Sequence, residues 1–224
     1  MISSSSLGIG LISALVINDD IYVVGSVNWS TSAPLKIYKS SDLKNFTEVG
    51  SLYPMAGRRL FNSSLIFNKG KFILAVEEDQ NNQNGFFPNF YESTDLIHWN
   101  KIAELRFTKY IACPTLKYVN GTYYLFYLLN DSNSHVYYTS ISRSVDLKQW
   151  QQSGRVVVAP GTDEGQNASD FDLVEYKSQV IMNFAIGNQD GDRPVWSDIN
   201  KALYNGSLQS FVESFFTSPL ISQN

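Results

Sequence analysis

Four acidic side chains lie within a short stretch in the last third of the sequence. They are Asp163, Glu164, Asp170 and Asp172. Two carboxyl groups that face one another raise each other's pKa, so that one can donate a proton while the other accepts one. Asp170 and Asp172 are two residues apart in an apolar segment, which places them on one face of a strand. We treat these two as candidate acid–base residues, whereas Asp163 and Glu164 are typical of a solvated loop.

A second acidic group, Glu77-Glu78-Asp79, follows the apolar run Phe72–Val76. Strand alternation places the side chain of Glu77 on the same face as Ala75. Glu77 is therefore a third candidate catalytic carboxylate, and the alternative is an exposed acid at the end of a strand.

Three residues in the first third of the sequence are suited to binding a hydroxylated ligand. Arg59 can clamp a carboxylate or a pair of hydroxyl groups, because its guanidinium presents a planar fork of donors. Trp29 can stack on a sugar ring, although an aromatic residue of the core is an equal alternative. Asn62 follows Arg59 by three residues and offers an amide.

The elements that must position these residues are predicted by an internal repeat. Similar segments occur at 40–46, 93–99 and 144–150, with a weaker fourth copy at 205–211. A pair of short apolar runs around an Asn, Lys or Gly turn precedes each copy, which predicts a hairpin. Four antiparallel strands repeated about every fifty residues are typical of a β-propeller blade. We predict an all-β propeller in a single domain, 1–224, with four-stranded blades at about 7–50, 60–106, 110–155 and 168–217.

Each strong copy of the repeat contains an aspartate, namely Asp42, Asp95 and Asp146. The functional alternative is a set of catalytic acids. The pattern Ser-Xaa-Asp-Leu favours a structural role, in which the carboxylate accepts hydrogen bonds from backbone N–H groups of the turn. We expect the neighbouring Leu and Trp or Phe to pack between blades.

Propeller geometry indicates where a site lies. The innermost strand of each blade starts beside the central axis, and the second strand ends there. The first of these series contains Ile12, Asn62, Cys113 and Asp170. The second series contains Trp29, the acids 77–79, the pair 130–131 and the stretch 188–190. From the two series we predict binding roles for Asn62, Cys113 and Asp190, in addition to Arg59 and Trp29.

Composition excludes several classes of function. The 224 residues include 43% hydrophobic and 14% aromatic side chains, which excludes a disordered polymer. A net charge of −4 without a basic cluster argues against a nucleic-acid partner. The apolar run at 7–17 is too short to span a bilayer, so we expect no membrane partner. With two His and one Cys, the sequence indicates neither a zinc site nor a Ser-His-Asp triad, and we expect no metal or cofactor.

At this point the sequence resembles the five-bladed β-propeller glycoside hydrolases of families 43 and 32, and more closely a family-43-like group of uncertain activity. The resemblance covers nearly the whole chain. It rests on the stretches 59–64, 112–118, 142–150, 167–176 and 203–216, with the repeated Asp-Leu-Xaa-Xaa-Trp.

The resemblance implies a base Asp, a pKa-tuning Asp and an acid Glu at the starts of inner strands. This sequence departs from that pattern. Asn62 stands where the tuning Asp aligns, Ala112 stands where the acid Glu aligns, and no Asp-Pro occurs near the first blade. Asp170, Asp172 and Glu77 are the acids that could replace the missing set.

Two functions follow, and both have carbohydrate as partner. The first is hydrolysis of O-glycosidic bonds in an oligo- or polysaccharide, in which one carboxyl group protonates the leaving oxygen and the other acts as base or nucleophile. The alternative is a non-catalytic propeller that binds carbohydrate or protein and has lost the catalytic acids of the family.

Two further expectations concern the chain as a whole. Four blades where the resemblance implies five would leave apolar blade faces uncovered, which predicts self-association or an upstream segment. Asn-Xaa-Ser/Thr triplets indicate either glycosylation after secretion or the usual crowding of these residues in turns, and no signal peptide is recognised. The triplets begin at Asn28, Asn45, Asn62, Asn120, Asn130, Asn167 and Asn205.

Overall fold

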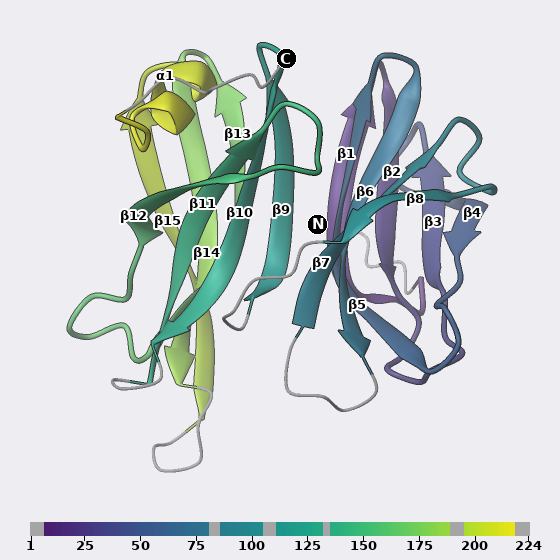
Figure 1. The fold of residues 1–224 in the computed structure, drawn as a ribbon, viewed down its shortest axis with the longest axis horizontal. Coiled ribbons are helices and arrows are strands. Elements are labelled where there is room, and N and C mark those ends of the chain that lie inside the picture. The colour runs from purple at the N-terminus through teal and green to yellow at the C-terminus, as the bar shows by residue number, and fades with distance from the viewer. Residues whose placement is uncertain (1–6, 81–85, 105–110, 132–134, 189–194, 218–224) are drawn as a thin grey trace. The chain divides into compact units, whose positions relative to one another are not determined.

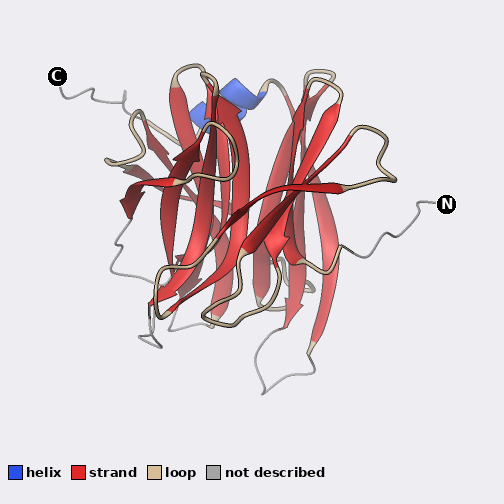
Figure 2. Ribbon diagram, turned by 90° about the vertical axis from the view of Figure 1, so that its right-hand side faces the viewer, coloured by secondary structure: helices blue, strands red, loops and turns tan. Residues whose placement is uncertain are grey.

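The computed structural model describes residues 7–80, 86–104, 111–131, 135–188 and 195–217 (Figure 1). Within these ranges the chain forms fifteen strands and one short helix, so the predicted all-β class is confirmed (Figure 2). The chain divides into two compact units, 1–107 and 108–224, and each is described by itself. The prediction of a single domain spans both units and stays a prediction.

Unit 1 contains two four-stranded antiparallel sheets, each with its strands in chain order. We call them blade 1 and blade 2. Blade 1 consists of β1 (Gly10–Ile17), β2 (Asp20–Ser26), β3 (Leu35–Ser40) and β4 (Thr47–Leu52). Blade 2 consists of β5 (Arg58–Asn68), β6 (Lys71–Gln80), β7 (Phe86–Ser93) and β8 (Asn100–Glu104).

Unit 2 contains blades 3 and 4, which are joined into one sheet by a single parallel pair, Tyr137 with Asn167. Blade 3 consists of β9 (Ile111–Val119), β10 (Thr122–Asp131), β11 (Val136–Ser144) and β12 (Gln151–Val158). Blade 4 consists of β13 (Asn167–Tyr176), β14 (Gln179–Asn188) and β15 (Trp196–Asn205), and helix α1 (Leu208–Glu213) follows it. The predicted four-stranded antiparallel blades of a propeller are confirmed for blades 1, 2 and 3. Among the described residues, blade 4 has three strands followed by a helix.

The predicted hairpins between the first two strands of each blade are confirmed. In blade 2, Lys69 and Gly70 have φ values of 50° and 78°, and in blade 3, Asn120 and Gly121 have 46° and 86°. Two successive positive φ values are the signature of the type I′ turn, whose twist matches that of the flanking strands. These turns fix the register that positions the far ends of the inner strands.

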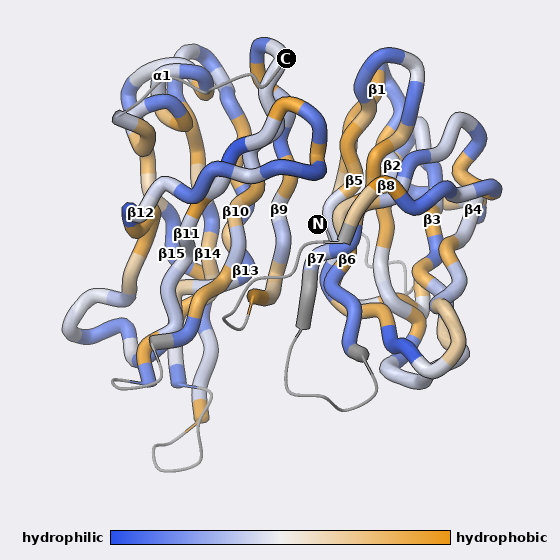
Figure 3. The backbone as a smooth tube through the Cα atoms, in the orientation of Figure 1, coloured by the Kyte–Doolittle hydropathy of each residue, from blue (hydrophilic) through white to orange (hydrophobic). Residues whose placement is uncertain are grey.

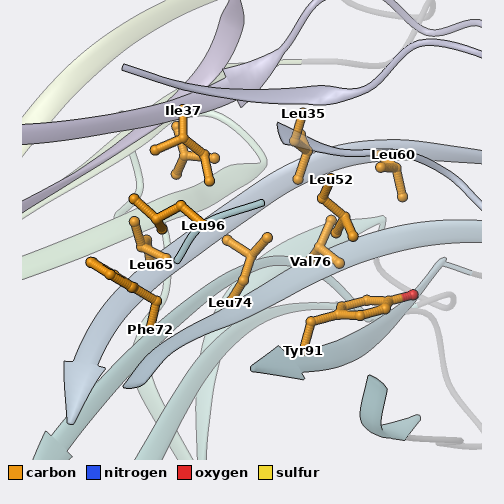
Figure 4. Close-up of a cluster of buried hydrophobic side chains, with 11 residues drawn as sticks. Leu35, Ile37, Leu52, Leu60, Leu65, Phe72, Leu74, Val76, Tyr91 and Leu96 are labelled. Atoms are coloured by element: carbon orange, nitrogen blue, oxygen red, sulfur yellow. The ribbon is translucent and has the colours of Figure 1, made fainter. Parts of the chain in front are cut away.

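The core of unit 1 lies between blades 1 and 2 (Figure 4). Val24, Leu35 and Ile37 of blade 1 pack with side chains of blade 2, among them Leu74 and Leu96. A Cβ atom on Gly50 of β4 would lie 2.1 Å from the backbone oxygen of Leu96, so only glycine allows this close approach of the two blades.

The core of unit 2 shows why blade 4 differs from the prediction. We predicted a four-stranded blade that ends at about residue 217, but among the residues that the structure describes helix α1 follows the third strand. Ser207 begins the helix as its N-cap, and its side chain accepts a hydrogen bond from the N–H of Ser210. Phe211 and Val212 are buried in the same cluster as Phe171 and Leu173 of β13, so the helix covers apolar surface in place of a strand.

The structural role predicted for the repeated aspartates is confirmed. In the third copy, Asp146 Oδ1 accepts hydrogen bonds from the N–H groups of Lys148 and Gln149 at 2.8 and 2.9 Å. Partial burial raises the pKa of Asp146, but the hydrogen bonds from Gln149 and Lys148 outweigh it and leave the pKa below its ordinary value. The packing prediction is confirmed for Leu96, which joins the core between blades 1 and 2, and is wrong for Leu43, which is exposed.

Apolar residues lie mostly in the strands and polar residues in the turns (Figure 3), but each blade also exposes some apolar side chains. They include Ile12, Val16 and Leu43 in blade 1, Phe67 and Ile97 in blade 2, Val145 and Val156 in blade 3, and Val174, Ile199 and Leu203 in blade 4. These positions are compatible with the predicted self-association, which stays a prediction. In the part of the chain that the structure describes, no helix is long and apolar enough to cross a bilayer.

Candidate functional site

A β-bulge interrupts the innermost strand of every blade at an equivalent point. In each bulge two residues of the inner strand face one residue of the second strand. The two-residue sides are 11–12 in β1, 61–62 in β5, 113–114 in β9 and 170–171 in β13. Bulges redirect side chains and are frequent beside active sites, so the four equivalent bulges are where a site is to be sought. The predicted series Ile12, Asn62, Cys113 and Asp170 falls on these bulges.

The residue that faces the bulge differs in chemical type between blade 2 and the other blades. These residues are Gly25, Glu77, Tyr127 and Phe184. All four are buried, but only Glu77 carries a carboxylate. The two residues that follow this position also carry carboxylates in blade 2 alone, where they are Glu78 and Asp79. The corresponding pairs are Ser26-Val27 in blade 1, Leu128-Leu129 in blade 3 and Ala185-Ile186 in blade 4.

The three acids of blade 2 are buried and bonded to nearby side chains. Their exposed fractions are 3% for Glu77, 0% for Glu78 and 5% for Asp79. Asn62 donates its amide N–H to Glu77 Oε2 at 3.0 Å. A buried carboxylate is costly unless such partners replace its water, so each of these acids requires its partner.

Two arginines at the start of β5 supply the remaining partners. Arg58 Nη1 lies 2.6 Å from Glu78 Oε2, and the hydroxyl of Tyr91 donates to the other oxygen of Glu78. Arg59 donates from both Nε and Nη2 to Asp79 Oδ2, with Nε at 2.9 Å. We call this group the blade-2 network. It consists of Arg58, Arg59, Asn62, Glu77, Glu78, Asp79 and Tyr91.

An aromatic group adjoins the blade-2 network. Trp29 lies between β2 and β3, and its ring centroid is 6.2 Å from that of Phe61. The guanidinium carbon of Arg59 lies 5.4 Å from the Phe61 ring centroid, within cation–π range. Trp29 is 64% exposed and Phe61 only 8%, so Trp29 presents its ring to solvent while Phe61 is covered.

The acids of unit 2 have different surroundings. Asp170 is exposed, has a left-handed φ of 49°, and accepts a hydrogen bond from the hydroxyl of Ser169 at 2.9 Å. The Ser169 oxygen in turn accepts from the buried amide of Asn167 at 2.8 Å. Asp172 Oδ1 lies 2.8 Å from Lys117 Nζ and accepts from the N–H of Leu173.

The predicted site residues are thus distributed between the units. Unit 1 brings together Trp29, Arg59, Asn62 and Glu77. Unit 2 contains Asp170, Asp172 and Cys113, and Cys113 is half-buried on its bulge with a φ of 49°. Asp190 lies outside the described residues.

Sequence reasoning missed Tyr91 and Phe61. Tyr91 belongs to β7, where it pairs with Leu74 of β6, and the sequence does not show that its hydroxyl reaches the carboxylate of Glu78 farther along β6. Phe61 directly precedes the candidate Asn62 in the bulge of β5. The available signal was the pair Arg58-Arg59, which stands just upstream of this aromatic residue. Among the described residues, no group of three or more His, Cys, Asp or Glu side chains could hold a metal ion.

Comparison with solved structures places this geometry in a known fold. The GH32 β-fructofuranosidase of Bombyx mori, solved as a mutant in complex with sucrose, matches with a TM-score of 0.67 and 12% identity over 88% of this chain. A thermostable family-43 glycoside hydrolase matches with a TM-score of 0.68 and 15% identity over 90% of this chain and 70% of its own. The chain has the β-propeller fold of the family 32 and family 43 glycoside hydrolases.

A third similar structure is an exo-β-1,3-galactanase of Phanerochaete chrysosporium with β-1,3-galactotriose, at a TM-score of 0.64 and 15% identity. The chain spans 46% of the length of this enzyme and of the β-fructofuranosidase. No protein-family model and no curated protein matches the sequence. At these identities the likeness concerns the fold, so activity and ligand must be argued from this chain's own residues.

Proposed function

We propose that this protein binds carbohydrate through the blade-2 network. One observation carries the proposal: blade 2 has three buried carboxylates at positions where the other three blades have uncharged residues. The fold does not require them, because the same bulge forms opposite Gly25, Tyr127 and Phe184.

The chemistry of the blade-2 network is suited to hydroxyl groups. A sugar hydroxyl both donates and accepts a hydrogen bond, and carboxylate, amide and guanidinium groups together supply both partners. Perturbed or buried ionisable groups gather at functional sites more often than elsewhere. The similar structures that contain sucrose and β-1,3-galactotriose support this choice of ligand class.

The test is ligand binding by Glu77→Gln, which keeps the shape of the side chain and removes its charge. Isothermal titration with sucrose, β-1,3-galactotriose and xylotriose should detect binding of at least one by the wild type. Loss of one hydrogen bond to a charged group is worth about 1.5–3 kcal/mol, so Glu77→Gln should bind roughly tenfold or more weakly.

The matched control is Glu92→Gln, because Glu92 lies in the same blade and pairs with Lys71 at the surface, at 2.9 Å. It should bind as the wild type does. Equal affinity of Glu77→Gln and the wild type would refute a role for the blade-2 network in binding. If the wild type binds none of the three sugars, the proposal that it binds these carbohydrates is refuted.

Hydrolysis of a glycosidic bond is the second candidate, and the position of Asp170 favours it. Asp170 presents an exposed carboxylate on the bulge of β13, whereas the two-residue sides of the other three bulges contain no carboxylate. Asp170 would be one carboxyl group, and Asp172 of the same strand the other.

Turnover of aryl glycosides tests this second candidate. Asn adopts left-handed φ as readily as Asp, so Asp170→Asn removes the charge without new backbone strain. We expect the wild type to hydrolyse the substrate. Asp170→Asn should abolish this hydrolysis, and Asp163→Asn should leave it intact. Turnover that survives in Asp170→Asn would exclude this assignment.

A further inference from the structure

We propose that Trp29 is a stacking platform for one pyranose ring of the bound carbohydrate. This inference rests on the proposed function and adds the residue that orients the ligand. The platform is the solvent-facing ring of Trp29, supported by Phe61, and it adjoins the blade-2 network through Arg59.

Exposure distinguishes Trp29 from the tryptophans with structural roles. Trp99 and Trp150 are partly buried, and their indole N–H groups donate to the backbone oxygens of Leu96 and Leu147 in the repeated turn. Trp29 lies outside these turns and is 64% exposed. A large aromatic ring that stays mostly in water contributes less to the fold than a buried one, and aromatic side chains are frequent where a ligand is bound.

The loop around Trp29 is held by its own hydrogen bonds. Asn28 Oδ1 accepts from the N–H of Ser30 at 2.8 Å, and the hydroxyl oxygens of Ser30 and Ser32 are 3.3 Å apart. The N–H of Ala33 donates to the backbone oxygen of Ser30, which closes the turn. The ring of Trp29 is therefore presented by an ordered turn, which lowers the entropy lost on binding.

A continuous series of side-chain contacts connects the platform with the charged groups. Trp29 contacts Phe61 at a ring angle of 47°, the Arg59 guanidinium lies over Phe61, and Asp79 holds Arg59 in place. Asn62, the next residue along β5, bonds Glu77. An aromatic face beside hydrogen-bonding groups matches a pyranose, whose C–H face is apolar and whose edge carries hydroxyl groups.

The experiment compares Trp29→Ala with Trp29→Phe, and uses Trp196→Phe as the control because Trp196 is a 38% exposed tryptophan of unit 2. Titrations use sucrose, β-1,3-galactotriose and xylotriose. An aromatic contact is worth about 0.5–1.5 kcal/mol, so Trp29→Ala should raise the Kd up to about tenfold. Trp29→Phe should recover most of that loss, and Trp196→Phe should match the wild type.

A second readout follows tryptophan fluorescence. Bound ligand should protect the wild type from quenching by acrylamide, and this protection should vanish in Trp29→Phe but persist in Trp196→Phe. Wild-type binding that Trp29→Ala leaves unchanged would overturn the platform and leave the proposed function standing. Equal weakening in Trp29→Ala and Trp29→Phe would also overturn stacking, and absence of wild-type binding would overturn both proposals.

Discussion

Blades 2 and 4 share the same backbone feature but place side chains of opposite polarity against it. Each has a bulge in its inner strand, and one buried residue of the second strand faces it. In blade 4 that residue is Phe184, which packs in the core with Phe171 and Leu173. In blade 2 it is Glu77, which is bonded to Asn62.

The difference shows that the bulge is compatible with either an apolar or a charged partner. An apolar side chain at this point is stabilised by removal from water, whereas a carboxylate loses hydration and must recover it through specific partners. Blade 2 therefore loses hydration free energy that blade 4 does not lose. We infer that the buried carboxylates of blade 2 are retained because they bind ligand, and three predictions test this comparison.

The largest effect is expected when the ion pair of Arg58 and Glu78 is broken. Arg58→Met leaves the buried carboxylate of Glu78 without its cation, which should cost about 3–5 kcal/mol of unfolding free energy. Denaturation in urea measures this.

A matched variant converts this part of blade 2 to the chemistry of blade 3, which has Leu128 at the position of Glu78. In Arg58→Met/Glu78→Leu/Tyr91→Phe no buried polar group of this set remains, so stability should return to within about 1 kcal/mol of the wild type or exceed it. A triple variant as unstable as Arg58→Met would show that the blade-2 network is needed for folding rather than for binding.

An intermediate effect is expected at the equivalent position of blade 3. The hydroxyl of Tyr127 lies 2.9 Å from that of Ser142, and burial raises its pKa. Tyr127→Phe should cost about 0.5–1.5 kcal/mol of stability. Because Tyr127 is structural in this comparison, carbohydrate affinity should not change, and a loss of affinity would contradict a purely structural role for Tyr127.

The smallest effect is expected at the turn aspartates, which blades 1, 2 and 3 share. The pKa of Asp146 is lowered in the folded state, so its charge stabilises the fold above the unfolded pKa of about 3.9. That contribution is lost as the pH falls through the folded-state pKa. Asp146→Asn should thus be less stable than wild type at pH 7, with the difference shrinking near pH 3. A difference of constant size would mean that the charge does not matter.

Much of the fold was predictable because it depends on short-range chemistry. The hairpins follow from Lys69-Gly70 and Asn120-Gly121, which accept the positive φ values of type I′ turns. The turn aspartates bond N–H groups two and three residues ahead, so the pattern around Asp146 was sufficient. Helix α1 was missed because Phe211 and Val212 fit either a strand or a helix, and the apolar surface of unit 2 selects the helix.

The sequence by itself determined the blades, the turns and the positions at which candidate side chains leave the inner strands. Only the tertiary structure decided which of these side chains meet. Arg58 and Glu78, twenty residues apart, pair because a bulge shifts the register of β5 against β6, and Trp29 reaches Phe61 because blades 1 and 2 pack face to face. Local turns are set by neighbouring residues, whereas partners across strands and blades depend on register and packing, which the whole unit determines.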